Sequence, residues 1–135
     1  MPKFIPFDRR SRPMPNIPLV TLQREGRLIS MNQKAYQLLQ SPASVELSYD
    51  PDEKLIGIRA IKPTDERGYA IRKQGHNNTG YEVAAQAFTR HWDIDTSIAR
   101  RYKAYMEGSF LVVDLKSEGE DATGVRSKFR KHNPE

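Results

Sequence analysis

The chain contains no cysteine, and this absence removes several classes of protein at once. Without thiols the protein has no disulfide scaffold, no thiolate zinc site and no cysteine nucleophile. It also has no apolar run near the roughly 20 residues that a membrane-spanning helix needs. The first 16 residues lack the apolar centre of a secretory signal. We therefore expect a cytoplasmic protein that does not contact a membrane.

Sequence motifs for catalysis are missing as well. The 135 residues include no phosphate-binding P-loop, no Gly-x-Ser-x-Gly elbow and no Gly-x-Gly-x-x-Gly fingerprint. The histidines His76, His91 and His132 are scattered without the spacing of metal ligands. We expect a protein that is not an enzyme, with no catalytic residues, no metal and no cofactor.

The formal net charge of +5 is carried mainly by the two ends of the chain. Residues 1–16 hold four basic residues and one acidic residue, whereas residues 17–115 hold 13 basic and 12 acidic residues. Basic arms on a near-neutral fold are typical of proteins that bind an anionic partner such as nucleic acid. Tails that only improve solubility would have the same composition, and this alternative stays open.

Composition divides the chain into four parts. Five prolines among the first 18 residues disfavour a helix or a central strand, so residues 1–16 are predicted to be an extended basic arm. Residues 116–135 are rich in alternating charges and are predicted to be a flexible tail. The segments between them, 17–64 and 65–115, are predicted to be two similar halves.

Both halves have the order strand, strand, helix, strand, strand. In the first half we expect these elements at residues 19–23, 28–31, 33–40, 45–49 and 55–58, with Asn32 as the helix cap. In the second half we expect them at residues 69–73, 81–84, 85–92, 101–106 and 110–115. A shift of 52 residues places Ala35-Tyr36 on Ala87-Phe88. The repeat is one of pattern, and chance similarity of common segments is the alternative.

The first half resembles the AbrB-type swapped-hairpin domain of bacterial transition-state regulators and MazE-like antitoxins. The resemblance rests on the turn Glu25-Gly26-Arg27, the helix Ala35–Leu39, the alternating Val45-Glu46-Leu47 and the segment from Asp50 to Arg59. The chain departs from the family pattern after this helix, where Pro42-Ala43-Ser44 replaces the usual Gly-Asp. The second half has Gly75 to Gly80 in place of the Gly-Arg turn.

In that family two copies interleave their strands into one small barrel that binds DNA. The resemblance therefore implies an α+β, β-rich fold. Two β-β-α-β-β halves would form a small swapped-hairpin-like barrel with pseudo-two-fold symmetry, flanked by extended N- and C-terminal arms. One half alone would bury too little surface to be stable. The function that this implies is non-enzymatic DNA binding, in a regulatory or architectural role.

The candidate binding residues are basic or polar and belong to turns, one strand and the N-terminal arm. We expect the turn residues of both halves to lie at one end of the fold, where arginine forks match phosphate oxygens. A second basic cluster is expected along the strand at residues 100–103. A solvated turn or outward strand face is the alternative for each. The residues are Arg24, Arg27, Arg72, Lys73, Gln74, His76, Arg100, Arg101, Lys103, Arg9, Arg10 and Arg12.

The expected partner is nucleic acid, with double-stranded DNA favoured over single strands. Exposed aromatic residues would stack on unpaired bases, and Tyr105 is the candidate because it is out of phase with the core positions of its strand. The alternative function is a protein-interaction module, such as an antitoxin-like partner or a subunit of a bacterial or phage assembly. Its arms would then wrap a neighbouring protein. A monomer and a homodimer are both compatible with the sequence.

Overall fold

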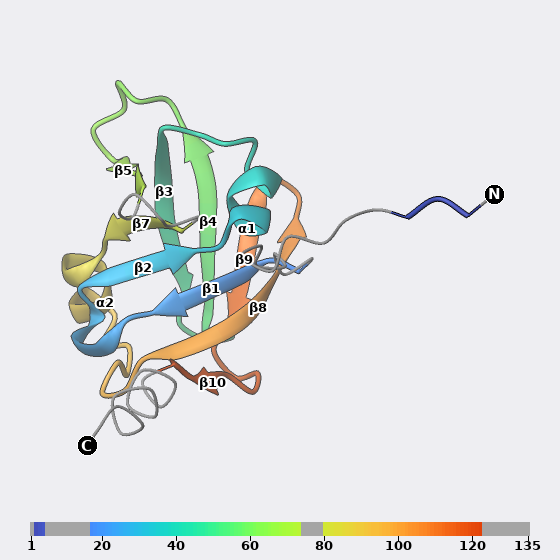
Figure 1. Ribbon diagram of the computed structural model, residues 1–135. Helices are drawn as coiled ribbons and strands as arrows, with labels where there is room; N and C mark the ends of the chain where they lie inside the picture. Colours follow the sequence, from blue (N-terminus) through green and yellow to red (C-terminus); the bar gives the residue numbers. More distant parts are fainter. Residues whose placement is uncertain (1, 5–16, 74–79, 123–135) are drawn as a thin grey trace, which may run out of the picture.

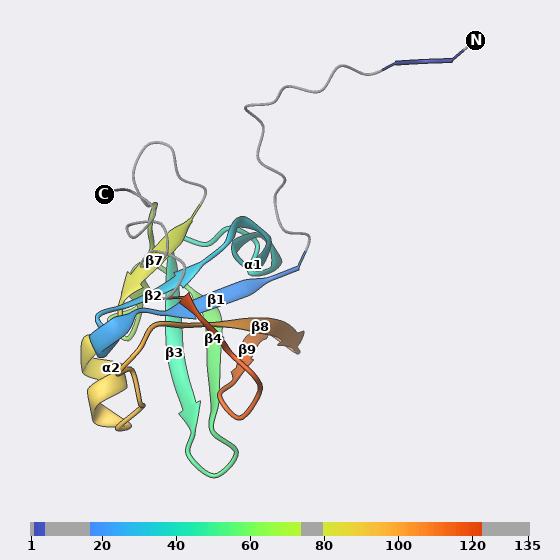
Figure 2. The same ribbon diagram turned by 60° about the horizontal axis from the view of Figure 1, so that its bottom comes forward.

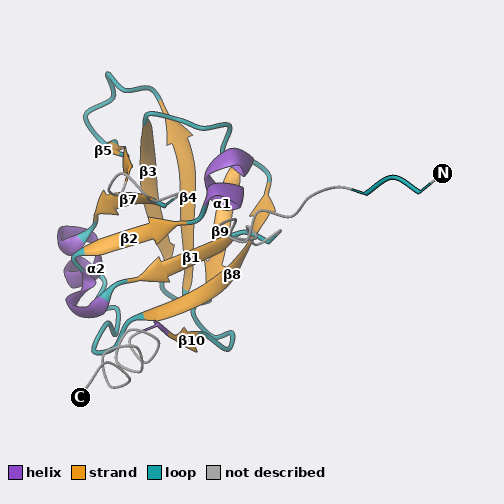
Figure 3. Ribbon diagram, in the orientation of Figure 1, coloured by secondary structure: helices purple, strands orange, loops and turns teal. Residues whose placement is uncertain are grey.

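The computed structural model describes residues 2–4, 17–73 and 80–122 (Figure 1). Strands dominate this part of the chain, and two short helices and one 3-10 turn accompany them (Figure 3). The elements are β1 (Leu19–Leu22), η1 (Arg24–Gly26), β2 (Leu28–Met31), α1 (Gln33–Leu38), β3 (Ser44–Asp50), β4 (Leu55–Ile61), β5 (Tyr69–Ala70), β6 (Arg72–Lys73), β7 (Tyr81–Ala84), α2 (Gln86–His91), β8 (Arg100–Glu107), β9 (Phe110–Asp114) and β10 (Glu120–Asp121).

All the strands belong to one antiparallel sheet that nearly closes into a barrel (Figures 1 and 2). The order along the sheet is β5-β3-β4-β9-β8-β1-β2-β7-β6, and β10 adds to β8. The two ends of this path, β5 and β6, are separated in sequence only by Ile71. Residues 69–73 therefore pair with β3 on one side and with β7 on the other, which joins the ends of the sheet.

Alternating side chains of the strands fill the interior of the barrel. Val20, Ile29, Ile56, Ile58 and Leu111 come from four different strands and are all 0% exposed. Successive side chains of a strand point to opposite faces, so the intervening residues face outward. Burial of each such aliphatic side chain contributes about 1.5–3 kcal/mol. The core therefore depends on both halves of the sequence.

The first helix begins where the sequence predicts. The Asn32 side chain accepts a hydrogen bond from the Ala35 N–H at 2.9 Å, which satisfies one of the free donors of the first helical turn. The same Oδ1 atom accepts from the Leu19 N–H at 3.0 Å. Asn32 therefore fixes both the start of α1 and its position against β1.

The expected elements agree with the observed ones except at their ends. Helix α1 stops at Leu38, before the predicted Gln40, because Gln40 and Ser41 have positive φ values of 67° and 52°. Strand β10 lies within the segment predicted as a flexible tail. It pairs Glu120 with Arg101 of β8, and this cross-strand ion pair favours the register. Most of the expected turn at 74–80 lies outside the described residues.

No helix among the described residues is long and apolar enough to span a membrane.

Candidate nucleic-acid interface

One outer face of the barrel carries most of the predicted binding residues that the structure describes. It consists of β1, β2, β7 and β6 together with the neighbouring part of β8, and we call it the binding face. The register places five outward positions in one row across these strands, Arg101, Thr21, Ser30, Glu82 and Arg72. With strands about 4.8 Å apart, the row extends roughly 19 Å from Arg101 to Arg72.

The two basic turns lie at opposite ends of this face, so the expectation that they share one end of the fold is wrong. The turn with Arg24 and Arg27 leads into β2, and Arg72 and Lys73 precede β7. Strands β2 and β7 are antiparallel neighbours, and their first residues therefore lie at opposite ends of the pair. The three residue steps of β2 separate the turns by about 10 Å along the strands.

The predicted cluster of Arg100, Arg101 and Lys103 is divided between two faces. Tyr102 and Ala104 are buried in the barrel, and Arg100 shares their side of the alternating strand. Arg100 instead lines a cleft at the end of the barrel. Arg101 and Lys103 face outward, as does Tyr105, whose exposure of 47% confirms that it lies outside the core.

Several of the predicted basic residues are engaged in ion pairs. Arg101 contacts Glu120 at 2.7 Å, Arg72 contacts Glu82 at 3.4 Å, and Arg27 contacts Glu25 at 3.5 Å. Within the described part of the chain, no carboxylate lies within 4.0 Å of the charged groups of Arg24, Lys73 or Lys103. These three exposed cations are therefore the ones most available to an anionic partner.

The β1–β2 turn is held in a fixed conformation by the opposite half of the chain. Gly26 has a φ of 68°, and its carbonyl oxygen accepts a buried hydrogen bond from the Thr89 hydroxyl at 3.1 Å. The Glu25 N–H donates to the Thr96 carbonyl oxygen at 2.8 Å. Helix α2 and the segment after it therefore set the positions of Arg24 and Arg27 (Figure 2).

The remaining predicted binding residues lie outside the described residues. They are Arg9, Arg10 and Arg12 near the N-terminus and Gln74 and His76 in the segment that follows β6. Nothing in the fold tests their predicted role.

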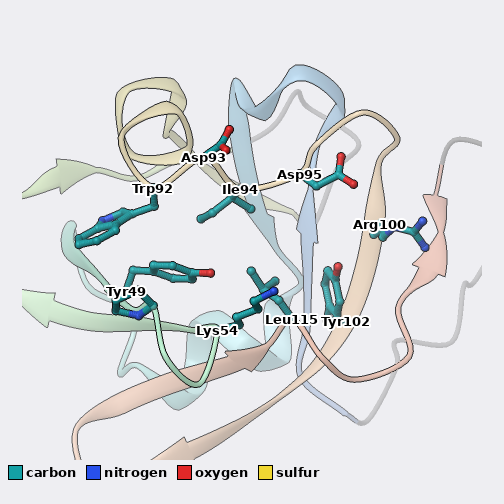
Figure 4. Close-up of a pocket in the computed structure, with 10 residues that line it drawn as sticks. Tyr49, Lys54, Trp92, Asp93, Ile94, Asp95, Arg100, Tyr102 and Leu115 are labelled. Carbon is teal, nitrogen blue, oxygen red and sulfur yellow. The ribbon is translucent and has the colours of Figure 1, made fainter.

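A cleft of about 430 Å³ lies apart from the binding face, and the sequence analysis did not find it (Figure 4). The segment with Asp93, Ile94 and Asp95 runs along one side, and Lys54 and Leu115 lie opposite. Trp92 and Tyr49 form one end, with ring centroids 5.4 Å apart, and Tyr102 and Arg100 form the other. The sequence signal was the only tryptophan of the chain, followed by the segment Asp93-Ile94-Asp95.

The charged side chains of the cleft differ in whether they already have hydrogen-bond or ion-pair partners within the protein. Asp95 accepts hydrogen bonds from the backbone N–H and the hydroxyl of Ser97, which lower the pKa of its carboxyl group, and Arg100 lowers it further. Burial raises the pKa of the Tyr102 hydroxyl. Among the described residues, neither Lys54 nor Asp93 has an ion pair or a side-chain hydrogen bond. Both remain available to a ligand.

No group of three or more histidine or acidic side chains in the described part of the chain is arranged to hold a metal ion. Comparison with known proteins adds no assignment: no protein family, no curated protein and no solved structure matches the chain.

Proposed function

We propose that the protein binds double-stranded DNA, without catalysis, through the binding face and the two basic turns that flank it. The observation that carries this proposal is the placement of the unpaired cations. Arg24 and Lys73 lie at opposite ends of one outer antiparallel surface, and Lys103 lies on the adjoining strand. A duplex presents phosphates along two backbones, so cations at both ends of this surface can contact it together.

We further propose that the barrel consists of two swapped-hairpin-like halves related by a pseudo-two-fold axis. The strand pairing supports this. In the two halves, β1 corresponds to β5 and β6, β2 to β7, β3 to β8 and β4 to β9. The observed pair β1–β8 then corresponds to the observed pair β5–β3, and β1–β2 corresponds to β6–β7. The pairs β2–β7 and β4–β9 each join one strand of the first half to its counterpart in the second. Such symmetry would give the binding face two equivalent ends.

The charge of the chain supports the same proposal. The N-terminal arm, with Arg9, Arg10 and Arg12, precedes β1, which is a strand of the binding face. The folded part between residues 17 and 115 is close to neutral. Binding would therefore combine a few positioned cations on the fold with a less specific electrostatic contribution from the arm.

Charge reversal at the two turns tests this function. We expect Arg24→Glu and Lys73→Glu each to lower duplex affinity by roughly tenfold, measured by fluorescence anisotropy at low salt. Lys62→Glu is the matched control, because Lys62 is exposed and follows β4 on the opposite wall of the barrel. The proposal fails if wild-type protein does not bind DNA at low salt, or if the control loses as much affinity as the turn variants.

A second candidate function is that of a protein-interaction module, and an exposed apolar patch favours it. Ile17 and Tyr105 are 43% and 47% exposed. They lie opposite each other on one face, because the register that pairs Leu19 with Lys103 continues through the hydrogen bond from the Ala104 N–H to the Pro18 carbonyl oxygen. A second copy of the chain is the partner that this patch predicts. Light scattering of wild type and of Tyr105→Asp would show a dimer and a monomer, and a monomeric wild type would contradict this function.

A further inference from the structure

We propose that the cleft next to α2 binds one nucleotide unit, a planar base with its attached phosphate. This inference does not depend on duplex binding, because the cleft lies at the end of the barrel and shares no residue with the three unpaired cations of the binding face. Its volume of about 430 Å³ falls within the roughly 300–1,000 Å³ typical of small-molecule sites.

The walls of the cleft suit a flat ring. Ile94 and Leu115 lie on opposite long sides, so a planar group between them would be contacted on both faces (Figure 4). Trp92 and Tyr49 close one end, and their rings are tilted by 46° to each other. By contrast, Tyr36 and Tyr81, which do not line the cleft, stack on each other with centroids 3.7 Å apart. The Trp92 ring is 37% exposed and can stack on a base.

The free charges of the cleft match the two polar parts of a nucleotide. Lys54 supplies an ammonium group that binds phosphate oxygens, while the Asp93 carboxylate accepts hydrogen bonds from an exocyclic amine or a sugar hydroxyl. The two residues lie on opposite sides of the cleft, and the Asp93 carboxylate points outward at the rim (Figure 4), so it would contact a part of the ligand that extends out of the cleft. Arg100 adds a second cation at the far end.

The backbone conformation of Lys54 and Asp93 is also unusual. Lys54 and Asp93 have positive φ values of 56° and 52°, which residues with a side chain adopt at a cost. Lys54 occupies the last position of a hairpin turn where glycine would avoid that cost. Strained residues occur at binding sites, and here the hairpin turn keeps Lys54 in this conformation at the edge of the cleft.

The single tryptophan makes the proposal directly measurable, because the intrinsic tryptophan fluorescence of the full chain reports on Trp92 alone. Titration with AMP is expected to change this fluorescence in a saturable way, with adenosine binding about tenfold more weakly because it lacks the phosphate. Lys54→Ala should weaken AMP binding by about tenfold, and Asp93→Asn should weaken it as well. The control Lys62→Ala removes an exposed lysine that does not line the cleft and should bind as wild type does.

Comparison of AMP with a short single-stranded oligodeoxyadenylate identifies the source of the nucleotide. Tighter binding of AMP indicates a free nucleotide, and tighter binding of the oligonucleotide that Lys54→Ala weakens indicates an unpaired base of a strand. Both results support the proposal. It is overturned if calorimetry and fluorescence detect no binding at millimolar AMP, if Lys54→Ala and Lys62→Ala bind AMP equally, or if free tryptophan binds as tightly as AMP.

Discussion

At the scale of single residues, two glycines with the same backbone conformation differ in what surrounds them. Gly26 and Gly108 have φ values of 68° and 62°. A Cβ atom at Gly26 would lie 2.3 Å from Oγ1 and 2.9 Å from Cβ of Thr89, whereas one at Gly108 would meet nothing within 4 Å. The first glycine is required by close packing as well as by conformation, and the second by conformation alone.

The two alanine variants therefore form a matched pair. We expect Gly108→Ala to lower the free energy of unfolding by about 1 kcal/mol, the cost of the left-handed conformation. Gly26→Ala should cost about 3 kcal/mol, because overpacking against Thr89 is added to the same conformational cost. Urea unfolding followed by circular dichroism measures both. Equal losses in the two variants would mean that the contact between the β1–β2 turn and α2 does not constrain the protein.

At the scale of elements, α1 depends on one side chain that also belongs to the sheet. The Asn32 Oδ1 atom accepts from Ala35 and Leu19, and its Nδ2 atom donates to the Ile17 carbonyl oxygen at 2.9 Å. Asn32→Ala should lower the free energy of unfolding by about 2 kcal/mol, the upper part of the range for helix caps. Asn32→Asp keeps the acceptor oxygen and should lose less than half as much in urea unfolding. An alanine variant as stable as wild type would contradict this role.

Elements could be predicted from the sequence wherever the pattern is local. Strand alternation and the Asn32 cap gave β2 and the start of α1 at the observed residues. The relative placement of elements could not be predicted in this way. Whether Arg24 and Lys73 share an end depends on the antiparallel pairing of β2 with β7, which joins residues 50 to 56 positions apart. The same applies to the cleft, whose residues come from four separate segments of the chain.

At the scale of the whole molecule, charge is distributed unevenly between a nearly closed sheet and the two ends of the chain. Strands from residues 17–64 alternate along the sheet with strands from residues 65–115. Each basic turn is therefore held by contacts with the other part of the chain: the first by Thr89, and the second through the pairing of β5 with β3. Most of the net positive charge of the chain comes from residues 1–16 and 116–135. An anionic duplex would thus be attracted by the whole chain and positioned by the few unpaired cations of the binding face.

The salt dependence of duplex binding tests this central claim most directly. Affinity of the wild-type protein should fall steeply as salt rises, because each phosphate contact releases counterions and adds about 0.9 to the slope of log affinity against log salt. The double variant Arg24→Ala/Lys73→Ala should bind more weakly, with a slope shallower by about 1.8. A wild-type affinity that does not change with salt, or an identical slope in the double variant, would contradict the proposal that these two turns contact DNA.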